Sequence, residues 1–266
     1  MTQTTAHIPN ITEHQPANND SPLAWRIWDD VQDYDVASAV ARDTELGIEI
    51  ANGAPATFRI WENAQALIVS RHDAIRPRFA KARQHMEQQG WPIVVRSTGG
   101  SAIPHRHGVL HLSMVLARSA AIALSLVDVY QMLCMPIQKV LYELGINSYF
   151  SSVQNAFCDG HYNLVTGGKK IAGTAQTWRS NIAQGKRGRE GYILAHASLF
   201  VDVDSCEITD AVRQFYLMLG EDTQVKPGSI ITVRDCLQAH NGSCNDSGSP
   251  LIKNIRSRLF SALTNQ

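Results

Sequence analysis

One cysteine of this 266-residue chain stands in a setting that suits a nucleophile. Cys158 lies in the polar sequence NAFCDGHYN, whereas Cys134 lies in an apolar stretch with helical spacing. His161 and Lys170 follow Cys158 closely, and a cation near a thiol favours the reactive thiolate. Most lone cysteines are inert core residues, so spacing alone makes Cys158 a candidate for covalent catalysis beside that alternative.

Lys170 stands at the start of a run of small and apolar residues, 171–176, that is typical of a strand. A lysine at this place can reach into a pocket, where it would stabilise an oxyanion or hold a carboxyl or phosphate group. The alternative is an exposed lysine beside the tight turn at Gly167-Gly168.

A glycine pair lies in the segment RSTGGSAI, which begins at Arg96 and follows an apolar strand pattern. Two glycines let backbone N–H groups approach an anion or a carbonyl closely, and Arg96 can add a bidentate cation. A plain turn is the alternative for a glycine pair. The phosphate-binding pattern G-x-x-x-x-G-K-S/T is absent here and at Gly167-Gly168.

Three histidines, His105, His107 and His111, fall within seven residues. They invite a metal site, but no carboxylate or cysteine stands at a supporting offset. We therefore expect no metal and favour partly buried, hydrogen-bonded histidines. The five cysteines, at positions 134, 158, 206, 236 and 244, form no C-x-x-C pair. Their odd number predicts reduced thiols in a cytoplasmic protein.

The elements that must position these residues follow from periodicity and turn signals. Residues 22–53 have helical spacing, and the short runs 57–62 and 66–70 resemble a strand pair. Helices are predicted over 76–89, 124–145, 204–219 and 250–263, with Pro136 as a possible kink. Strands are predicted at 93–96, 108–117 and 192–203, and a hairpin joins 162–166 to 170–179.

Strands and helices are mixed without a regular alternation, which favours an α+β fold with a central mixed sheet flanked by helices. We predict a flexible tail at 1–21 and one domain over 22–266 that ends in a helical segment. Net charge is zero, so composition favours neither nucleic acid nor a membrane as partner. The start lacks the pattern of a signal peptide, and no apolar run is long enough to span a membrane. The basic segment 169–189 either steers an acidic partner protein or is simply solvated.

These signals occur in a recognisable order. RSTGGSAIPHRHGVLHLS resembles the Arg-x-Ser/Thr-Gly-Gly stretch of the biotin/lipoate A/B protein ligase family, and GGKKIAGTAQTWR resembles its Gly-x-Lys strand. HASLFVDVD is similar to the strand that follows, so the resemblance covers roughly residues 45–205. FCDGHYNLVTGGKK is most similar to the branch of octanoyltransferases and lipoyl amidotransferases that use a cysteine.

The resemblance implies a fold related to the class II synthetase and biotinyl-lipoyl ligase catalytic domains, with an acyl tunnel over the sheet. It implies Cys158 and Lys170 as catalytic residues. It implies a substrate-binding set formed by Arg96, Ser97, Thr98, Gly99, Gly100, Ser101, Ala102, His105, Gly173, Thr174 and Ala175. We expect the apolar residues of 171–175 and 109–115 to line the tunnel. Three positions depart from the family pattern, with Val95 at the first of two arginines, Arg106 at an acid and Asn163 at an aspartate.

Two activities follow from the resemblance, and a third possibility is a binding protein without turnover. An acyltransferase would move an octanoyl or lipoyl group through a Cys158 thioester onto a lysine of a lipoyl-domain protein, and it would need no cofactor. A lipoate–protein ligase would instead use ATP and Mg to form a lipoyl-adenylate. The implied donors are acyl carrier protein or a lipoylated or octanoylated carrier such as a glycine-cleavage H-type protein. The implied acceptors are lipoyl domains of 2-oxoacid dehydrogenase complexes.

The transferase mechanism carries a geometric condition. In a straight hairpin that turns at Gly167-Gly168, Cys158 would lie opposite Thr177, far along the strand from Lys170. The loop 151–160 must therefore fold back over the strand for Cys158 and Lys170 to meet.

Overall fold

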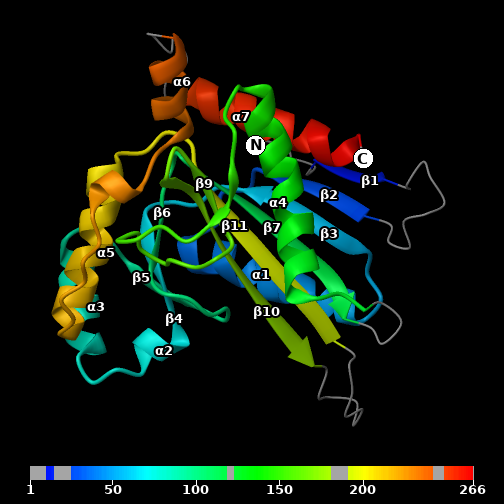
Figure 1. Cartoon of the computed structure of the whole chain (residues 1–266). Helices are drawn as coiled ribbons and strands as arrows, with labels where there is room; N and C mark the ends of the chain where they lie inside the picture. The colour runs from blue at the N-terminus through cyan, green and yellow to red at the C-terminus, as the bar shows by residue number, and fades with distance from the viewer. Residues whose placement is uncertain (1–9, 15–24, 119–122, 181–190, 242–248, 266) are drawn as a thin grey trace, which may run out of the picture.

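The computed structural model describes residues 10–14, 25–118, 123–180, 191–241 and 249–265 (Figure 1). In this part of the chain, eight strands form a large sheet in the order β1-β2-β3-β7-β11-β10-β9-β8, and three form a small sheet in the order β5-β4-β6. The strands of the large sheet are β1 (Asn10–His14), β2 (Trp25–Asp30), β3 (Ala56–Trp61), β7 (Val109–Arg118), β8 (Tyr149–Ser151), β9 (Asn163–Thr166), β10 (Lys169–Ser180) and β11 (Gly191–Phe200). Those of the small sheet are β4 (Ala66–Ser70), β5 (Ile93–Arg96) and β6 (Ile103–His105).

The helices form layers over both sheets. The described helices are α1 (Val36–Ala51), α2 (Arg71–Ala74), α3 (Phe79–Gln88), α4 (Leu126–Glu143), α5 (Ser205–Leu219), α6 (Val233–Asn241) and α7 (Ser249–Thr264), with a short 3-10 turn η1 (Pro227–Ser229). In Figure 1, α1 lies behind the large sheet, α4 crosses its front, and α3 and α5 lie together beside the small sheet. β2 and β3 run parallel and their neighbours antiparallel, so the predicted mixed sheet flanked by helices is confirmed.

Alternation along β7 and β11 decides what each face of the large sheet presents. Leu110, Leu112 and Met114 of β7 join the core beneath α4 and α7. His111 and Ser113, which stand between them, point to the side of α1. Successive strand residues face opposite sides, so a face of the sheet that carries polar groups lies under α1.

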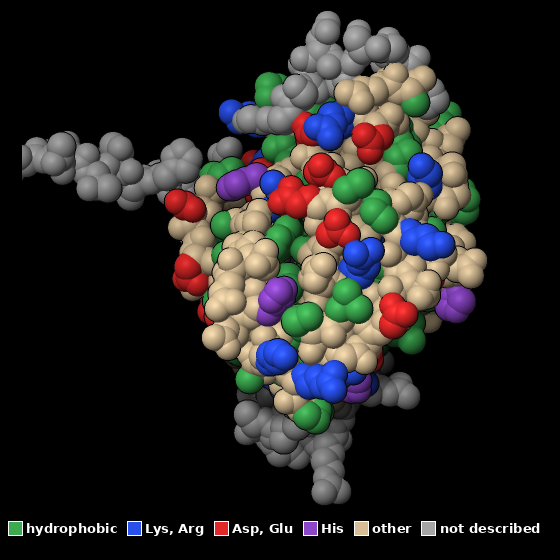
Figure 2. Space-filling view, turned by 90° about the vertical axis from the view of Figure 1, so that its left-hand side faces the viewer, with side chains coloured by type: hydrophobic (Ala, Val, Ile, Leu, Met, Phe, Trp, Pro, Cys, Tyr) green, Lys and Arg blue, Asp and Glu red, His purple; other side chains and the backbone are tan. Residues whose placement is uncertain are grey.

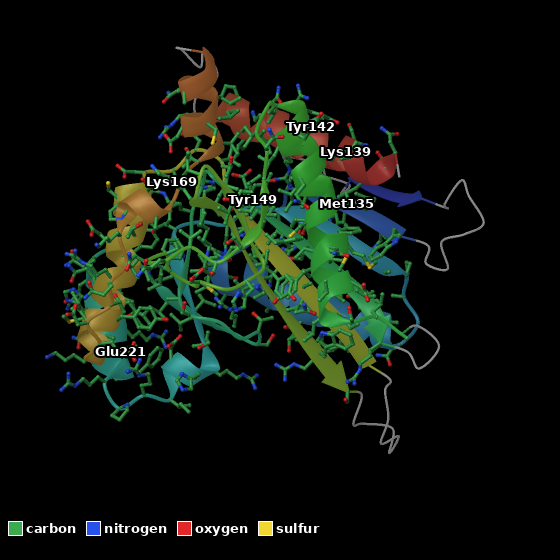
Figure 3. The ribbon with its side chains drawn as sticks, in the orientation of Figure 1. Met135, Lys139, Tyr142, Tyr149, Lys169 and Glu221 are labelled. Carbon is green, nitrogen blue, oxygen red and sulfur yellow. The ribbon has the colours of Figure 1, made fainter. Side chains whose placement is uncertain are left out.

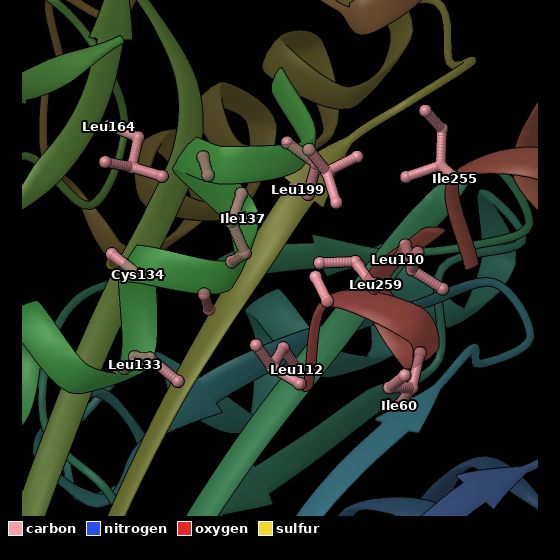
Figure 4. Close-up of a cluster of buried hydrophobic side chains, with 14 of the residues drawn as sticks. Ile60, Leu110, Leu112, Leu133, Cys134, Ile137, Leu164, Leu199, Ile255 and Leu259 are labelled. Atoms are coloured by element: carbon pink, nitrogen blue, oxygen red, sulfur yellow. The ribbon is translucent and has the colours of Figure 1, made fainter. Parts of the chain in front are cut away.

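The helix predicted over 124–145 is confirmed as α4. It begins with a capping box, in which Ser125 and Asp128 each accept a hydrogen bond from the other's backbone N–H. Pro136 lies within the helix. The apolar face of α4 packs on the sheet and on α7 (Figure 4). Figure 4 labels Leu133, Cys134 and Ile137 on α4, and Ile255 and Leu259 on α7.

A buried charge network joins α1 to the sheet. The Arg59 side chain is fully buried and pairs with Asp30 and Asp43, each at 2.8 Å. Asp43 also accepts a hydrogen bond from Ser113, which in turn accepts one from the Trp61 indole N–H. Because a buried charge is costly unless it is paired, this network fixes α1 and the Trp61 ring relative to the sheet.

The sequence predictions need three corrections. Residues 25–30 form strand β2 rather than helix, because they pair in parallel with β3, and the helix begins only after its N-cap, Asp35. The runs 57–62 and 66–70 are not partners, since β3 pairs in the large sheet and β4 in the small one. Strand β1 lies within 1–21, so the expected tail is paired with β2 over residues 10–14. Residues 1–9 and 15–21 fall outside the described part.

The hairpin at Gly167-Gly168 forms as predicted, with β9 antiparallel to β10. Both glycines have a positive φ, at 53° and 74°, which is the conformation that a tight hairpin turn requires. None of the helices in the described ranges is long and apolar enough to cross a membrane.

Candidate active site

The loop between β8 and β9 brings Cys158 to Lys170. β8 pairs with β9 from Tyr149 to Ser151, and the chain then leaves the sheet. The Lys170 ammonium donates hydrogen bonds to the carbonyl oxygens of Phe157, at 2.7 Å, and of Cys158, at 2.8 Å. The loop therefore folds back over the lysine strand, and the geometric condition of the transferase mechanism is met.

Two anchors hold this loop in place. The Asp159 carboxylate accepts hydrogen bonds from the Val153 N–H at 2.8 Å and from the Asn163 amide at 3.0 Å. The Phe157 ring is buried with its centroid 5.8 Å from that of Phe200. Asn163 thus has a role that the family's usual aspartate could fill only when protonated, because the position must donate a hydrogen bond.

Cys158 has a strained backbone. Its φ is +48°, in the left-handed region where a non-glycine residue costs about 1–2 kcal/mol. Phe157 is buried and Cys158 is partly exposed, and the Cys158 sulfur lies close to Gly100 of the glycine-rich loop. Strain of this kind is concentrated at functional sites.

Arg96 shapes the glycine-rich loop from within. Its guanidinium is buried and donates to the carbonyl oxygens of Ile68 at 3.1 Å, and of Gly99 and Ser101, each at 2.8 Å. The sequence suggested that Arg96 would offer a bidentate cation to a substrate, but these bonds turn the group towards the chain's own backbone. Arg179 adds a hydrogen bond to the Ser97 carbonyl oxygen at 2.6 Å.

Gly100 is the point where the two loops meet. A Cβ at Gly100 would lie 3.1 Å from the Cys158 Sγ and 3.0 Å from an Arg96 nitrogen, and its φ is +94°. Gly99 has no atom within 4 Å of the same position. The close approach of the two loops therefore requires a glycine at position 100 but not at position 99.

The charges around Cys158 favour the thiolate. Burial opposes ionisation, but the positive charges of Lys170 and Arg96 and hydrogen bonding from Ser101 outweigh it, so the pKa of Cys158 lies below its ordinary value. Burial lowers the pKa of Lys170 to about 8, although the charges of Cys158 and Asp159 act to raise it. Lysine and cysteine therefore stabilise each other's charged forms.

The other described cysteines differ in this respect. Burial raises the pKa of Cys134, and it raises that of Cys236 to about 11. Cys206 is exposed, and Cys244 lies outside the described residues. Only Cys158, among the four described, combines partial exposure with a lowered thiol pKa.

Two adjoining cavities flank the glycine-rich loop. The outer one, of about 660 Å³, is bordered by Cys158, by Ser97 to Ser101 and by residues 70–73. The inner one, of about 450 Å³, extends between the large sheet and the small sheet beneath α1. Arg71, Ser97 and Thr98 line both, so the thiol cavity and the inner cavity meet at these residues.

The wall of the inner cavity contains two buried histidines, His105 and His111, and the half-buried His196. His105 and His111 lie with ring centroids 3.9 Å apart, and they hydrogen bond to Asn63 at 3.2 Å and to Ser198 at 2.9 Å. Burial lowers the pKa of His105 well below its ordinary value and that of His111 to about 3, so both rings are neutral. The hydrogen-bonded interpretation of these two histidines is confirmed. His107 points outward with a side chain 85% exposed.

Metal-ligating groups do not converge within the described residues. No cluster of three or more His, Cys, Asp or Glu side chains that would hold an ion occurs there.

The residues after Lys170 play different parts. A Cβ at Gly173 would lie 3.1 Å from the Lys170 Nζ, so this glycine leaves room for the lysine. Ala175 is paired with His196, a wall residue of the inner cavity, whereas Thr174 donates to the Tyr162 carbonyl oxygen at 2.7 Å. None of residues 171–175 lines the inner cavity, whose walls come from β3, β7, β11, α1 and the small sheet.

Ala102 and two distant residues complete the site. Ala102 is buried and donates its N–H to the Tyr216 hydroxyl at 2.8 Å, which ties the glycine-rich loop to α5. His196 lies within hydrogen-bonding reach of Thr98, at 3.4 Å, and burial lowers its pKa to about 3. Sequence reasoning missed both roles. His196 heads the HASLF motif and was visible, but Tyr216 has no local signal.

A model of the lipoyl protein ligase A/B catalytic domain family matches residues 35–237. The chain belongs to this family. A relative from Kyrpidia tusciae, named octanoyl-GcvH:protein N-octanoyltransferase, is 42% identical over 193 residues, which make up 72% of this chain and 66% of the relative. A Listeria monocytogenes relative, named lipoyl-GcvH:protein N-lipoyltransferase, is 27% identical over 76% of this chain and 70% of its own. The match thus spans just under two thirds of the first relative.

Solved lipoate-protein ligases share the fold of this chain. A lipoate-protein ligase A bound with ATP superposes with a TM-score of 0.59 and 19% identity, covering 84% of this chain and 79% of that one. A bipartite lipoate protein ligase from Thermoplasma acidophilum gives 0.56 and 18%, covering 85% and 78%. The family predicted from the motifs is confirmed. The names of the relatives agree with the predicted octanoyl or lipoyl transferase, and they point to a GcvH-type carrier as a protein on which those enzymes act.

Proposed function

We propose that this chain transfers an octanoyl or lipoyl group from a carrier protein to a lysine of a lipoyl-domain protein through a thioester on Cys158. A GcvH-type carrier is the proposed donor, because the names of the two relatives include that carrier. Acyl carrier protein as donor and lipoyl domains of 2-oxoacid dehydrogenase complexes as acceptors belong to the same proposal. A thiol nucleophile also fits the reducing cytoplasm as the compartment.

In the first step, the Cys158 thiolate attacks the acyl carbonyl. The new C–S bond forms as the bond to the lysine nitrogen of a GcvH-type carrier breaks, and that nitrogen takes up a proton from the solvent and leaves as an amine; with acyl carrier protein as donor, the bond that breaks is that of its thioester. Lys170 has three N–H donors, of which two bind the carbonyls of Phe157 and Cys158. The third is available to the charge that develops on the carbonyl oxygen.

In the second step, the amine of the acceptor lysine attacks the thioester and releases the Cys158 thiolate. With a GcvH-type donor one lysine amide is thereby exchanged for another, and with acyl carrier protein a thioester is converted to an amide, so neither overall reaction needs ATP. The thioester intermediate separates donor from acceptor, which allows both proteins to use the same site in turn.

The acyl chain would lie in the inner cavity. Its volume of about 450 Å³ begins at Ser97 and Thr98, which it shares with the thiol cavity. Burying a C8 chain contributes roughly 5 kcal/mol at about 0.8 kcal/mol per methylene. The neutral His105 and His196 in the wall supply polar contacts without the cost of a buried charge.

An ATP-dependent ligase is the second candidate, because a ligase with bound ATP shares the fold. The residues implied for a nucleotide fit it poorly in this chain. Arg96 and Lys170 already donate to backbone carbonyls of their own loops, and Cys158 occupies the place between them. A nucleotide therefore has no role in the proposed reaction.

The observation that carries the proposal is the setting of Cys158, a partly exposed cysteine on a strained turn that borders a cavity and lies beside a buried lysine. The test is intact-mass spectrometry after incubation with octanoylated carrier, without and with ATP. We expect an octanoyl adduct on the wild-type chain in the absence of ATP. We expect Cys158→Ala to lose it, and Cys206→Ala, an exposed cysteine, to keep it.

Two results would contradict this proposal. Acyl transfer that survives in Cys158→Ala would exclude the thioester, and transfer that requires ATP would favour the ligase. Binding of the carrier with neither an adduct nor transfer would favour a binding protein without turnover.

A further inference from the structure

We propose that the segment 71–78 is the docking surface for the acyl-carrying protein, and that it binds carboxylates placed around that protein's modified lysine. This inference rests on the proposed function and adds where the partner binds and by what chemistry. We call residues 71–78 the basic turn.

The position of the basic turn follows from the thiol cavity. Residues 70–73 and Arg76 line the outer cavity, opposite the loop that carries Cys158. An acylated lysine must extend through this cavity for its carbonyl to reach the thiol, while the body of the carrier stays outside. The rim of the cavity must therefore contact the carrier, and the basic turn is one side of that rim.

The exposed charged side chains of the basic turn are positive. Arg71, His72 and Arg78 are exposed, whereas the only acid of the segment, Asp73, is buried and caps α2 through Ser70. Arg76 pairs with Glu221 at 2.7 Å across the rim. No ion pair is found for Arg71 or Arg78 among the described residues. Exposed cations without partners, beside a site that must receive a protein, favour a partner surface with carboxylates.

An apolar side chain stands among these cations. Ile75 is 80% exposed, and its backbone is held by a hydrogen bond from its N–H to the Arg71 carbonyl oxygen at 3.2 Å. An apolar anchor surrounded by arginines is the composition that protein interfaces favour. Figure 2 shows Lys and Arg side chains gathered with hydrophobic and His side chains at the lower end of this face, where α2 lies in Figure 1.

Exposed apolar side chains also lie on α4, and this surface serves as a comparison for the basic turn. Met135 and Tyr142 are 52% and 73% exposed, with Lys139 between them, and Figure 3 shows all three along the outer side of α4. α4 packs on the face of the large sheet that is opposite to α1 and the inner cavity. A carrier bound there could not extend its lysine into the thiol cavity.

The test compares two acyl donors on each variant. Octanoylated carrier protein needs docking, whereas a small octanoyl thioester such as that of N-acetylcysteamine can load Cys158 without it. The variants are Ile75→Asp and Arg78→Glu, neither of which lines a cavity. The matched controls are Met135→Asp and Lys139→Glu on α4. Loading is measured by intact mass, and kcat/KM is measured at several salt concentrations.

We expect kcat/KM with the carrier to fall at least about tenfold in Ile75→Asp, with thioester loading and melting temperature unchanged. For Arg78→Glu we expect a smaller loss and a weaker dependence on salt than in the wild-type enzyme. Carrier kinetics unchanged in both variants, or a matching loss in the α4 variants, would overturn the docking surface. A wild-type chain that is loaded by neither donor would instead overturn the proposed function.

Discussion

Alanine substitutions at the two adjacent glycines of the RSTGGSA loop are predicted to have very different effects. An alanine at Gly100 would place its Cβ 3.1 Å from the Cys158 Sγ and 3.0 Å from Arg96, closer than such atoms normally pack. It would also keep φ near +94°, which costs an L-residue about 1–2 kcal/mol. At Gly99 nothing lies within 4 Å, and no positive φ is required.

The strain at Gly100 is relieved if the loop moves away from Cys158, and that movement removes the contacts that favour the thiolate. A loss of about 1–3 kcal/mol at the thiol corresponds to a rate lower by roughly fivefold to 150-fold. We therefore expect Gly100→Ala to lower both kcat/KM for transfer and the rate of Cys158 alkylation by iodoacetamide at neutral pH. Gly99→Ala should stay within about twofold of the wild type.

The assay is the alkylation rate of each variant as a function of pH, followed by intact mass, with transfer kinetics on the same preparations. Melting temperatures serve as the control, since both glycines lie on a loop outside the hydrophobic clusters and neither change should unfold the chain. If Gly100→Ala alkylates and transfers as fast as Gly99→Ala, then the contact between the glycine loop and the thiol does not matter, and the reasoning is refuted.

Three further predictions follow from the charges. Lys170→Met removes the positive charge that lowers the pKa of Cys158, so the midpoint of the alkylation rate against pH should move to higher pH. An unchanged midpoint would show that Lys170 does not affect the ionisation of Cys158. In the wild type, Lys170 loses its proton above about pH 8, so loading of Cys158 by a small octanoyl thioester should decline there, and a rate that keeps rising to pH 10 would contradict the lysine's role. Arg59→Met leaves Asp30 and Asp43 buried without their cation, which should cost about 3–5 kcal/mol in urea unfolding. A loss below about 1 kcal/mol would mean that water reaches these carboxylates.

Local patterns in the sequence were sufficient for much of the fold. The helix α4 follows from its apolar spacing, and the β9–β10 hairpin follows from Gly167-Gly168. Such features depend on residues within a few positions of one another, so the chain encodes them directly. The failures occurred where pairing is distant: residues 25–30 have helical spacing but form a strand, because β3 lies alongside them.

The motifs also identified the chemical groups in advance. Cys158, Lys170 and the loop from Arg96 to Ala102 occur in the order typical of the family, and residue types alone made a thiol, a cation and close backbone N–H groups available. The catalytic roles of these residues are still proposals. What the sequence determined was which groups are present, since residue identity fixes charge and nucleophilicity before any fold exists.

The tertiary structure decided which of these groups meet. The hairpin register by itself keeps Cys158 away from Lys170, and only the hydrogen bonds from the lysine to the Phe157 and Cys158 carbonyls close the gap. Burial then sets the charges, because a lysine in water would not have a pKa near 8. Tyr216 reaches the site from α5 through one hydrogen bond across more than a hundred residues. These contacts depend on how distant backbone and side-chain groups satisfy one another in the folded chain, and no local pattern records them.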